Sequence, residues 1–427
     1  MLTSQDPRLA GRVAFTHPNF VSYTLARFFV VVALEMQSVA VRWRVYEITK
    51  RPLDLGYVGL AQFAPGFVLF LFAGHAADRF DRRKLLIWCY SGFALCSALL
   101  LAISRRAPQS VHSIYVILVL LGIFRCFNSP ASRALLPQLV PEEHFANAVA
   151  WNASTFQIAT IAGPAIGGIA YALFRGPEAV YAIAVSVSIL ATLFTSRIHV
   201  RPTSPEKELA ERVAEKEPVS LRTVLAGFGF IWEKKLILGS ISLDMFAVLL
   251  GGAVALLPIY AREILHAGPW GLGLLRSAPG VGATLMAIAV AHRPIRRRAG
   301  LTMLFAVAAF GALTIVFGIS HSLILSLVAL FLAGASDMVS VIIRGTLVQV
   351  VTPNEMRGRV SAVDMLFIGA SNELGEFESG LTAQWFGTVP AVVLGGLGTL
   401  VVIAAWAWLF PELRKADQLT VAELVPK

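Results

Sequence analysis

The sequence predicts an all-α membrane protein with about twelve transmembrane helices, arranged as two pseudo-symmetric six-helix bundles. First, 56% of the 427 residues are hydrophobic and only 15% are charged, whereas soluble domains carry about 25% charge. Second, the apolar runs are about 18–25 residues long, which matches a hydrocarbon core of about 30 Å. Third, part of the chain repeats loosely after about half its length.

The apolar runs predict six helices on each side of one long polar stretch. The first six ranges are Phe20–Val41, Leu55–Ala73, Leu85–Ile103, Ser113–Arg133, Phe145–Phe174 and Ala179–Ile198. The second six are Leu236–Tyr260, Leu272–Ala291, Leu301–Ile319, Leu323–Arg344, Val360–Phe386 and Val389–Phe410.

The polar stretch at residues 199–225 is rich in Glu, Lys, Arg and Pro. It predicts a cytoplasmic linker between an N-terminal bundle at 1–198 and a C-terminal bundle at 226–427. We expect a short amphipathic surface helix just before the seventh membrane helix.

The internal repeat lies around the loops after the fourth and tenth helices. One offset, 344 − 133 = 211, relates three pairs of identical residues: Arg133 and Arg344, Gln138 and Gln349, and Val149 and Val360. Two parallel six-helix halves are typical of a rocker-type secondary transporter with its site between the halves.

The net charge of +10 is explained by orientation and anionic lipid, because the basic residues lie in short loops between apolar runs. This pattern argues against nucleic-acid binding. The larger basic set lies on the side that would hold both termini, so we expect both termini in the cytoplasm and the chain in the bacterial inner membrane. The first outer loop disagrees with this rule, since it carries Arg42, Arg44, Lys50 and Arg51. Residues 1–17 lack an apolar signal-peptide core, so we expect the first helix to act as the insertion signal.

The loop after the second helix reads Gly74-His-Ala-Ala-Asp78-Arg79-Phe-Asp81-Arg82-Arg83-Lys84. It resembles the signature loop of the major facilitator superfamily, which has a Gly, three residues, Asp-Arg and a basic cluster. Asp81 departs from the general pattern, which has Gly there, and resembles the enterobactin exporter-like branch of drug and siderophore efflux proteins.

The resemblance implies a conformational gate made by Gly74, Asp78, Arg79, Arg82 and Arg83. Asp78 would sit at the positive N-terminus of the eleventh helix when the cytoplasmic side is closed, and would thereby favour the outward-facing state. The alternative is that the basic residues merely anchor the loop inside. We also expect the chain to turn at Gly74.

Gly163-Pro164-Ala-Ile-Gly167-Gly168 in the fifth helix resembles part of a motif of proton-coupled exporters. The resemblance implies a role in preventing proton leak. The simpler interpretation is a kink and close helix packing.

Ionisable residues at membrane depth usually have a functional or paired reason. We single out Arg27, Glu35, Arg125, Asp244, Asp337 and Arg344. Asp337 and Arg344 align on one face of the tenth helix, with Arg133 and Arg344 as candidate residues of a cytoplasmic gate and Asp337 deeper.

The eleventh helix carries the strongest candidates. Glu373 and Glu376 share a helical face, as do Asn372 and Glu376, whereas Glu378 points elsewhere. Two neighbouring carboxylates in a low dielectric cannot both ionise easily, which suits a proton carrier. They could instead bind a cationic substrate or a metal, or pair structurally with Arg27 or Arg125. The equivalent positions of the fifth helix are Ala162, Ala165 and Gly167, so the cluster belongs to one half only.

Together these features predict a proton-coupled efflux transporter for small amphipathic molecules, drug-like or siderophore, working by alternating access as a monomer. A lysophospholipid flippase of the same superfamily is the alternative. We find no sequence motif for a metal site or cofactor, and no GxSxG elbow or phosphate-binding loop, so an enzyme is disfavoured. The absence of a large soluble domain likewise disfavours a receptor.

Overall fold

The computed structural model describes residues 11–106, 110–199, 221–295 and 297–416, and only the backbone of residues 70, 71, 78 and 221–224. Within these ranges twelve long helices account for the twelve expected ones. Ten of the described helices are long and apolar enough to span a membrane. The two other long helices are α3 and α15, and α15 carries four acidic residues between Asp364 and Glu378.

The chain divides into two compact units, Met1–Val41 with Ala64–Val219, and Arg42–Phe63 with Ser220–Lys427. This division differs from the one expected from the sequence, because the end of α2 and the start of α3 group with the C-terminal unit. The predicted linker lies mostly outside the described residues.

The N-terminal unit is built from α2 to α7, of which α2 and α3 continue into the other unit. In this unit α4 packs against α5 and α7, and α6 packs against α7. Phe124 of α5 fills the space over Gly92 of α4. The bounds are α2 (Pro18–Thr49), α3 (Pro52–Arg79), α4 (Arg82–Ser104), α5 (Val111–Leu135), α6 (Glu142–Leu173) and α7 (Pro177–Ser196), with η1 (Val13–Thr16) before α2 and η2 (Leu136–Gln138) after α5.

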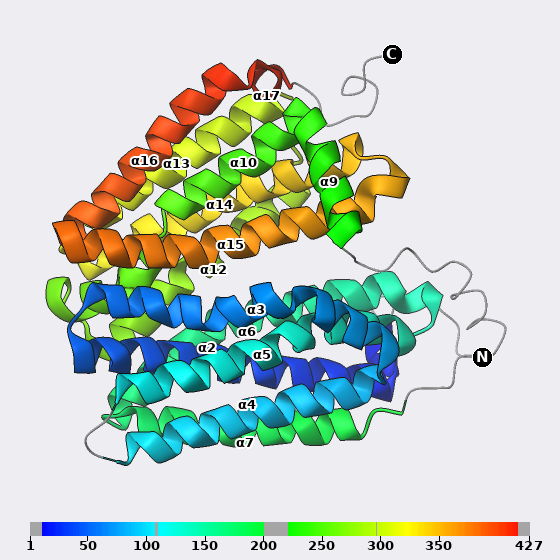
Figure 1. Cartoon of the computed structure of the whole chain (residues 1–427), viewed down its shortest axis with the longest axis vertical. Coiled ribbons are helices and arrows are strands. Elements are labelled where there is room, and N and C mark those ends of the chain that lie inside the picture. Colours follow the sequence, from blue (N-terminus) through cyan, green and yellow to red (C-terminus); the bar gives the residue numbers. More distant parts are fainter. Residues whose placement is uncertain (1–10, 107–109, 200–220, 296, 417–427) are drawn as a thin grey trace. The chain divides into compact units, whose positions relative to one another are not determined.

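The C-terminal unit holds the remaining helices. Figure 1 shows α10, α13, α14 and α16 running alongside one another, and they share a core that includes Leu243, Met303, Ile343 and Val402. The bounds are α9 (Leu221–Glu233), α10 (Lys235–Leu250), η3 (Ala253–Leu256), α11 (Leu257–Ile259), η4 (Tyr260–Ile264), α12 (Gly268–His292), α13 (Ala299–Ile319), α14 (Leu323–Val351), α15 (Asn354–Phe386), α16 (Thr388–Leu409) and α17 (Pro411–Lys415).

The seventh membrane helix is not continuous, contrary to the expected range Leu236–Tyr260. α10 ends at Leu250, and the chain continues through short 3-10, α and π segments to Ile264. Gly251 and Gly252 cause the break, because glycine has low helix propensity. A Cβ atom on Gly252 would lie 2.8 Å from the carbonyl oxygen of Gly375, so the break also lets the backbone approach α15 closely.

Three other helix ends were wrong in the sequence prediction. α2 runs past Val41 to Thr49, and α14 runs past Arg344 to Val351. α3 passes through Gly74 to Arg79, so the expected turn at Gly74 is wrong and the chain turns at Phe80 and Asp81 instead. A Cβ atom on Gly74 would meet nothing within 4 Å, so no packing demand interrupts the helix there.

The repeat found in the sequence recurs in the helix starts. α14 begins 323 − 111 = 212 residues after α5, α15 begins 354 − 142 = 212 after α6, and α16 begins 388 − 177 = 211 after α7. The last three long helices of each half therefore follow one plan.

Candidate functional site

Glu373 and Glu376 of α15 converge on Gly59 of α3. A Cβ atom on Gly59 would lie 2.7 Å from Oε2 of Glu376 and 3.0 Å from Oε2 of Glu373. Their spacing of three residues puts both carboxylates on one face of α15. Because Gly59 has no side chain, the two carboxylates can occupy the space beside it.

Arg42 of α2 is the partner of this acidic pair. Its Nη2 donates to Oε2 of Glu376 at 2.7 Å, and the two side chains are 5% and 13% exposed. At this burial, removing one partner would leave an uncompensated charge in a low-dielectric environment. Arg42 was expected in the first outer loop and not in the site, because the first helix was expected to end at Val41, whereas α2 continues to Thr49. The signal was an arginine continuing an apolar helical run.

Two other basic residues of the expected first outer loop also pair with carboxylates. Arg44 pairs with Glu47 at 2.5 Å, and Arg51 lies 3.8 Å from Asp54. With Arg42 bonded to Glu376, three of the four basic residues are therefore neutralised by carboxylates.

Close backbone contacts hold the acidic stretch of α15 on two sides. On the side of α3, a Cβ atom on Gly56 would lie 3.0 Å from Cα of Phe377, and one on Gly380 would lie 3.1 Å from the Pro52 carbonyl. On the side of α10, a Cβ atom on Gly375 would lie 2.9 Å from the Leu249 carbonyl. The carboxylates are thus carried by a segment whose position is set by helix-to-helix contact, beside the break after α10.

Asn372 and Glu378 of this stretch make contacts within α15. Nδ2 of Asn372 donates to the Ile368 carbonyl at 2.8 Å, and its side chain is exposed. Oγ1 of Thr382 donates to Oε1 of Glu378 at 2.6 Å. Asn372, although aligned with Glu376 by spacing, bonds back to its own helix.

Further polar contacts tie the last turns of α2 to η4, the π segment beyond the break. The Tyr46 hydroxyl donates to Oε1 of Glu263 at 2.5 Å, and Nη1 of Arg262 lies 3.8 Å from Oε1 of Glu47. π-helical segments frequently occur at functional sites. Here one joins the end of the broken helix to the helix that carries Arg42.

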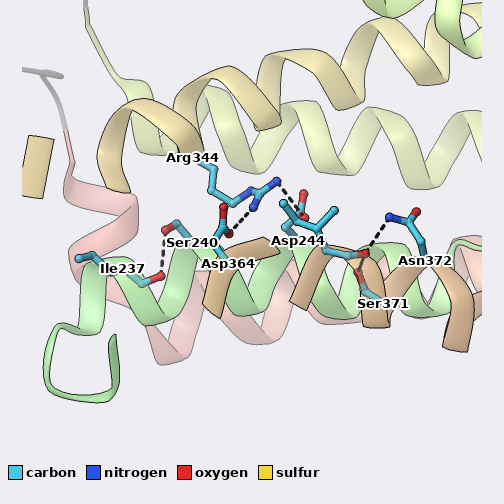
Figure 2. Close-up of polar contacts among 8 residues, drawn as sticks. Ile237, Ser240, Asp244, Arg344, Asp364, Ser371 and Asn372 are labelled. Atoms are coloured by element: carbon cyan, nitrogen blue, oxygen red, sulfur yellow. Dashed lines mark hydrogen bonds and ion pairs between the residues drawn. The ribbon is translucent and has the colours of Figure 1, made fainter. Parts of the chain in front are cut away.

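A second buried charge cluster lies in the C-terminal unit, between α10, α14 and α15 (Figure 2). Nη1 of Arg344 on α14 donates to Oδ1 of Asp364 on α15 at 2.6 Å, and Nη2 lies 3.3 Å from Oδ2 of Asp244 on α10. Arg344 is only 4% exposed. One guanidinium therefore joins three helices through two carboxylates.

Asp337 and Ser340 extend this cluster along α14. Residues 337, 340 and 344 share one face of the helix by their spacing. Asp337 interacts electrostatically with Asp244 and Arg344. Ser340 is buried, and its hydroxyl has no hydrogen-bond partner among the described residues.

In the N-terminal unit the candidates lie on α2 and α5. Nη1 of Arg27 donates to Oδ1 of Asn152 at 2.5 Å, and the guanidinium lies 5.1 Å from the ring centroid of Phe156. Glu35 lies against Gly163, where an added Cβ atom would be 2.5 Å from the Cβ of Glu35. Arg125 and Arg133 are exposed.

The Gly-Pro motif of α6 is a close-packing surface in this structure. A Cβ atom on Gly167 would lie 2.7 Å from Cα of Met36 and 2.8 Å from its carbonyl oxygen. Gly163, Pro164, Gly167 and Gly168 are all buried. Their small size lets α6 and α2 approach backbone to backbone.

The sequence model of the Major Facilitator Superfamily matches residues 23–376. The chain belongs to the major facilitator superfamily. It is a multi-pass membrane transporter of small molecules and not an enzyme.

The proteins related to this chain in sequence include enterobactin exporters. The chain is 28% identical over 409 residues to the enterobactin exporter EntS of Escherichia coli O1:K1, covering 94% of each chain. It is 27% identical to that of Citrobacter koseri, with the same coverage.

Solved structures of the superfamily share the fold at low identity. A bacterial homologue of the human lysosomal transporter Spinster, inward-facing and occupied, gives a TM-score of 0.72 at 12% identity, covering 92% of this chain and 96% of that one. A D-xylose–proton symporter gives 0.68 at 14% identity, covering 93% and 98%.

The superfamily signature loop joins α3 to α4 in the N-terminal unit. Asp81, the departure from the general pattern, caps α4 by accepting hydrogen bonds from the backbone N–H groups of Arg83 at 2.9 Å and Lys84 at 3.1 Å. The Arg83 side chain donates to the Ser196 carbonyl at the end of α7. Asp78 is helical, but its side chain lies outside the described residues, and Arg79 is exposed.

Proposed function

We propose that this chain is a proton-coupled exporter of small amphipathic molecules of the siderophore or drug-like class, working by alternating access. The observation that carries the proposal is the convergence of Glu373 and Glu376 on Gly59, with Arg42 bonded to Glu376. Ionisable groups at membrane depth that pair with one another mark proton and substrate pathways in transporters.

The cluster of Arg42, Glu373 and Glu376 could couple proton binding to a conformational change. Protonation of Glu376 would remove the charge that holds Arg42, and a buried Arg42 without a counter-charge is unstable. The chain would then favour a state in which α2 and α15 have separated at this point. Glu373, beside Glu376, can share or receive the proton. Binding of a proton thereby favours one conformation over the other.

The relatives support the class of cargo. The proteins that match over 94% of the chain carry the name enterobactin exporter. That relation supports export of a siderophore, or of a molecule of similar amphipathic character, from the bacterial cytoplasm across the inner membrane.

The remaining parts of the mechanism rest on the superfamily plan. We propose bundles at 1–198 and 226–427, a cytoplasmic linker at 199–225, both termini in the cytoplasm and a monomer as the working unit. Asp78 and the basic residues of its loop act as the cytoplasmic gate, with Arg133 and Arg344 at the equivalent ends of the two halves.

Transport in proteoliposomes with an imposed pH gradient tests the proposal. The substrates are a catecholate siderophore, a cationic dye and a labelled lysophospholipid. The double variant Glu373→Gln with Glu376→Gln should lose gradient-driven movement of the exported substrate. Glu378→Gln is the matched control, because Glu378 bonds to Thr382 within its own helix and should retain transport.

Gly59→Ala provides a second variant that leaves every charge in place. It should lower coupled transport, because the new methyl group would displace the two carboxylates. Gradient-driven transport that survives the double variant would show that the carrier lies elsewhere. Lysophospholipid movement that ignores the gradient would instead identify a flippase.

A further inference from the structure

α9 has two faces of opposite kind, although it lies outside the set of membrane-spanning helices. Ile231 is 1% exposed and belongs to a core with Ile237, Val360 and Val363. On the other face, Leu225, Phe228 and Trp232 are 67%, 42% and 65% exposed. Their spacing places them on one side of the helix.

α9 lies across the start of α15. Figure 1 shows α9 running at a steep angle to α15, near the N-terminal end of that helix. Gly227 makes the crossing close, because an added Cβ atom would lie 2.7 Å from the Arg359 carbonyl. We expect α15 to be the eleventh membrane-spanning helix, so a helix that crosses it steeply at one end would lie along the membrane surface.

The chemistry of the exposed face fits that position. The rings of Phe228 and Trp232 stack with centroids 6.0 Å apart, and Trp is enriched where hydrocarbon meets headgroups. Lys234 and Lys235 follow directly, are exposed, and have no ion-pair partner among the described residues. An apolar aromatic face beside unpaired lysines is the pattern of a helix that binds an anionic membrane surface.

We propose that α9 is a lateral membrane helix that inserts Leu225, Phe228 and Trp232 into the bilayer interface and binds anionic phospholipid headgroups through Lys234 and Lys235. The bound leaflet is the one at which α15 begins. Because α9 also packs on Val363 and Arg359 of α15, it connects that leaflet to the helix that carries the acidic pair. This inference is independent of the cargo and of the coupling ion.

Spin labels test the insertion. The free cysteines Cys89, Cys96 and Cys126 are replaced by alanine, and single cysteines are placed at positions 225, 228, 232 and 234 of the full chain in phosphatidylcholine–phosphatidylglycerol liposomes. Labels at the first three positions should be accessible to oxygen and protected from a water-soluble nickel reagent, with the opposite result at 234. Water-like accessibility at the first three overturns the proposal. So does inaccessibility to both reagents, which would mean that protein covers the face.

Retention of phosphatidylglycerol on the purified protein in native mass spectrometry tests the headgroup site. Each lysine near an anionic surface contributes about 5-fold in affinity, so Lys234→Gln with Lys235→Gln should lower the preference for phosphatidylglycerol over phosphatidylcholine by about 5- to 25-fold. Arg414→Gln with Lys415→Gln removes the same charge from the exposed end of α17 and should change it little. Equal losses in both double variants would overturn the assignment of the site to α9.

Discussion

Arg133 and Arg344 occupy equivalent positions of the repeat, but they differ in their exposure to solvent and in their ion pairs. Arg133, near the end of α5, is exposed, whereas Arg344 on α14 is 4% exposed and bridges Asp244 and Asp364. By the offset of 211 residues, Ala153 stands in the N-terminal half where Asp364 stands in the C-terminal half. The helical plan is shared, but the cluster of Arg344, Asp244 and Asp364 has no counterpart at Arg133.

The equivalent helices α6 and α15 differ in the same way. α6 approaches α2 through Gly163 and Gly167, whereas α15 presents Glu373 and Glu376 to Gly59 of α3. In each pair a glycine allows the close approach. In α6 the small residue serves backbone packing, and in the α15 pair the glycine on the neighbouring helix makes room for charge. Gly163 of α6 also lies against Glu35, so each copy has an ionisable residue beside a glycine, but only α15 presents two carboxylates to one glycine.

The largest difference in the free energy of unfolding should be between variants that lack Arg344 and variants that lack Arg133. Arg344→Met leaves two buried carboxylates uncompensated and should lower the free energy of unfolding by about 3–5 kcal/mol. Arg133→Met should change it by less than about 0.5 kcal/mol. Denaturant unfolding in detergent micelles measures both values, and combining Arg344→Met with Asp244→Asn and Asp364→Asn should recover much of the loss. Equal destabilisation by the two single variants would contradict the contrast.

A smaller effect should follow from filling the glycine contact of α6. Gly167→Ala places a methyl group within 3 Å of Met36 backbone atoms, which cannot rotate away, and should cost about 1–3 kcal/mol. Gly345→Ala on α14 is the control, since an added Cβ atom there meets nothing within 4 Å and alanine favours helix. The same unfolding experiment compares them. A neutral Gly167→Ala variant would show that the close approach of α6 and α2 is not required.

The N-terminal caps of α4 and α14 should differ in their contribution to the free energy of unfolding by about 1 kcal/mol or less. Asp81 accepts two backbone hydrogen bonds at the start of α4, whereas Ser322 accepts one, from Leu325 at 3.5 Å, at the start of α14. Asp81→Ala should therefore cost about 1 kcal/mol, and Ser322→Ala less. Asp81→Asn keeps the cap and should fall between Asp81→Ala and the parent. Hydrogen exchange of the first turn of each helix reports the loss locally, and a larger effect at Ser322 would reverse the ranking.

The smallest effect concerns the ion pair of Arg51 and Asp54, in which the arginine is exposed. Arg51 is 61% exposed and lies 3.8 Å from Asp54, so Arg51→Gln should change stability by less than about 0.5 kcal/mol, because solvent and salt screen the interaction. Arg42→Gln, which leaves Glu376 buried without its partner, should cost several-fold more. Unfolding at low and high salt checks the pair, and a salt-insensitive loss in Arg51→Gln would mean that Arg51 has another role.

The order of elements could be predicted from the sequence because apolar length and the cost of unsatisfied backbone groups in lipid permit few solutions. All twelve long helices, the half-chain offset and the shared face of Glu373 and Glu376 follow from one-dimensional spacing. The superfamily followed from the loop at Gly74–Lys84. These features depend on residues near one another in the chain.

Partners distant in sequence were decided by tertiary structure alone. Arg42 and Glu376 are separated by 334 residues, and no periodicity could show that Gly59 would lie beside them or that Arg344 would join Asp244 to Asp364. The close approach of Gly252, at the break after α10, to Gly375 likewise joins residues far apart in the sequence. Helix length is set by local free energy, whereas the pairing of buried charges is set by which helix faces meet, and only the packed chain determines that.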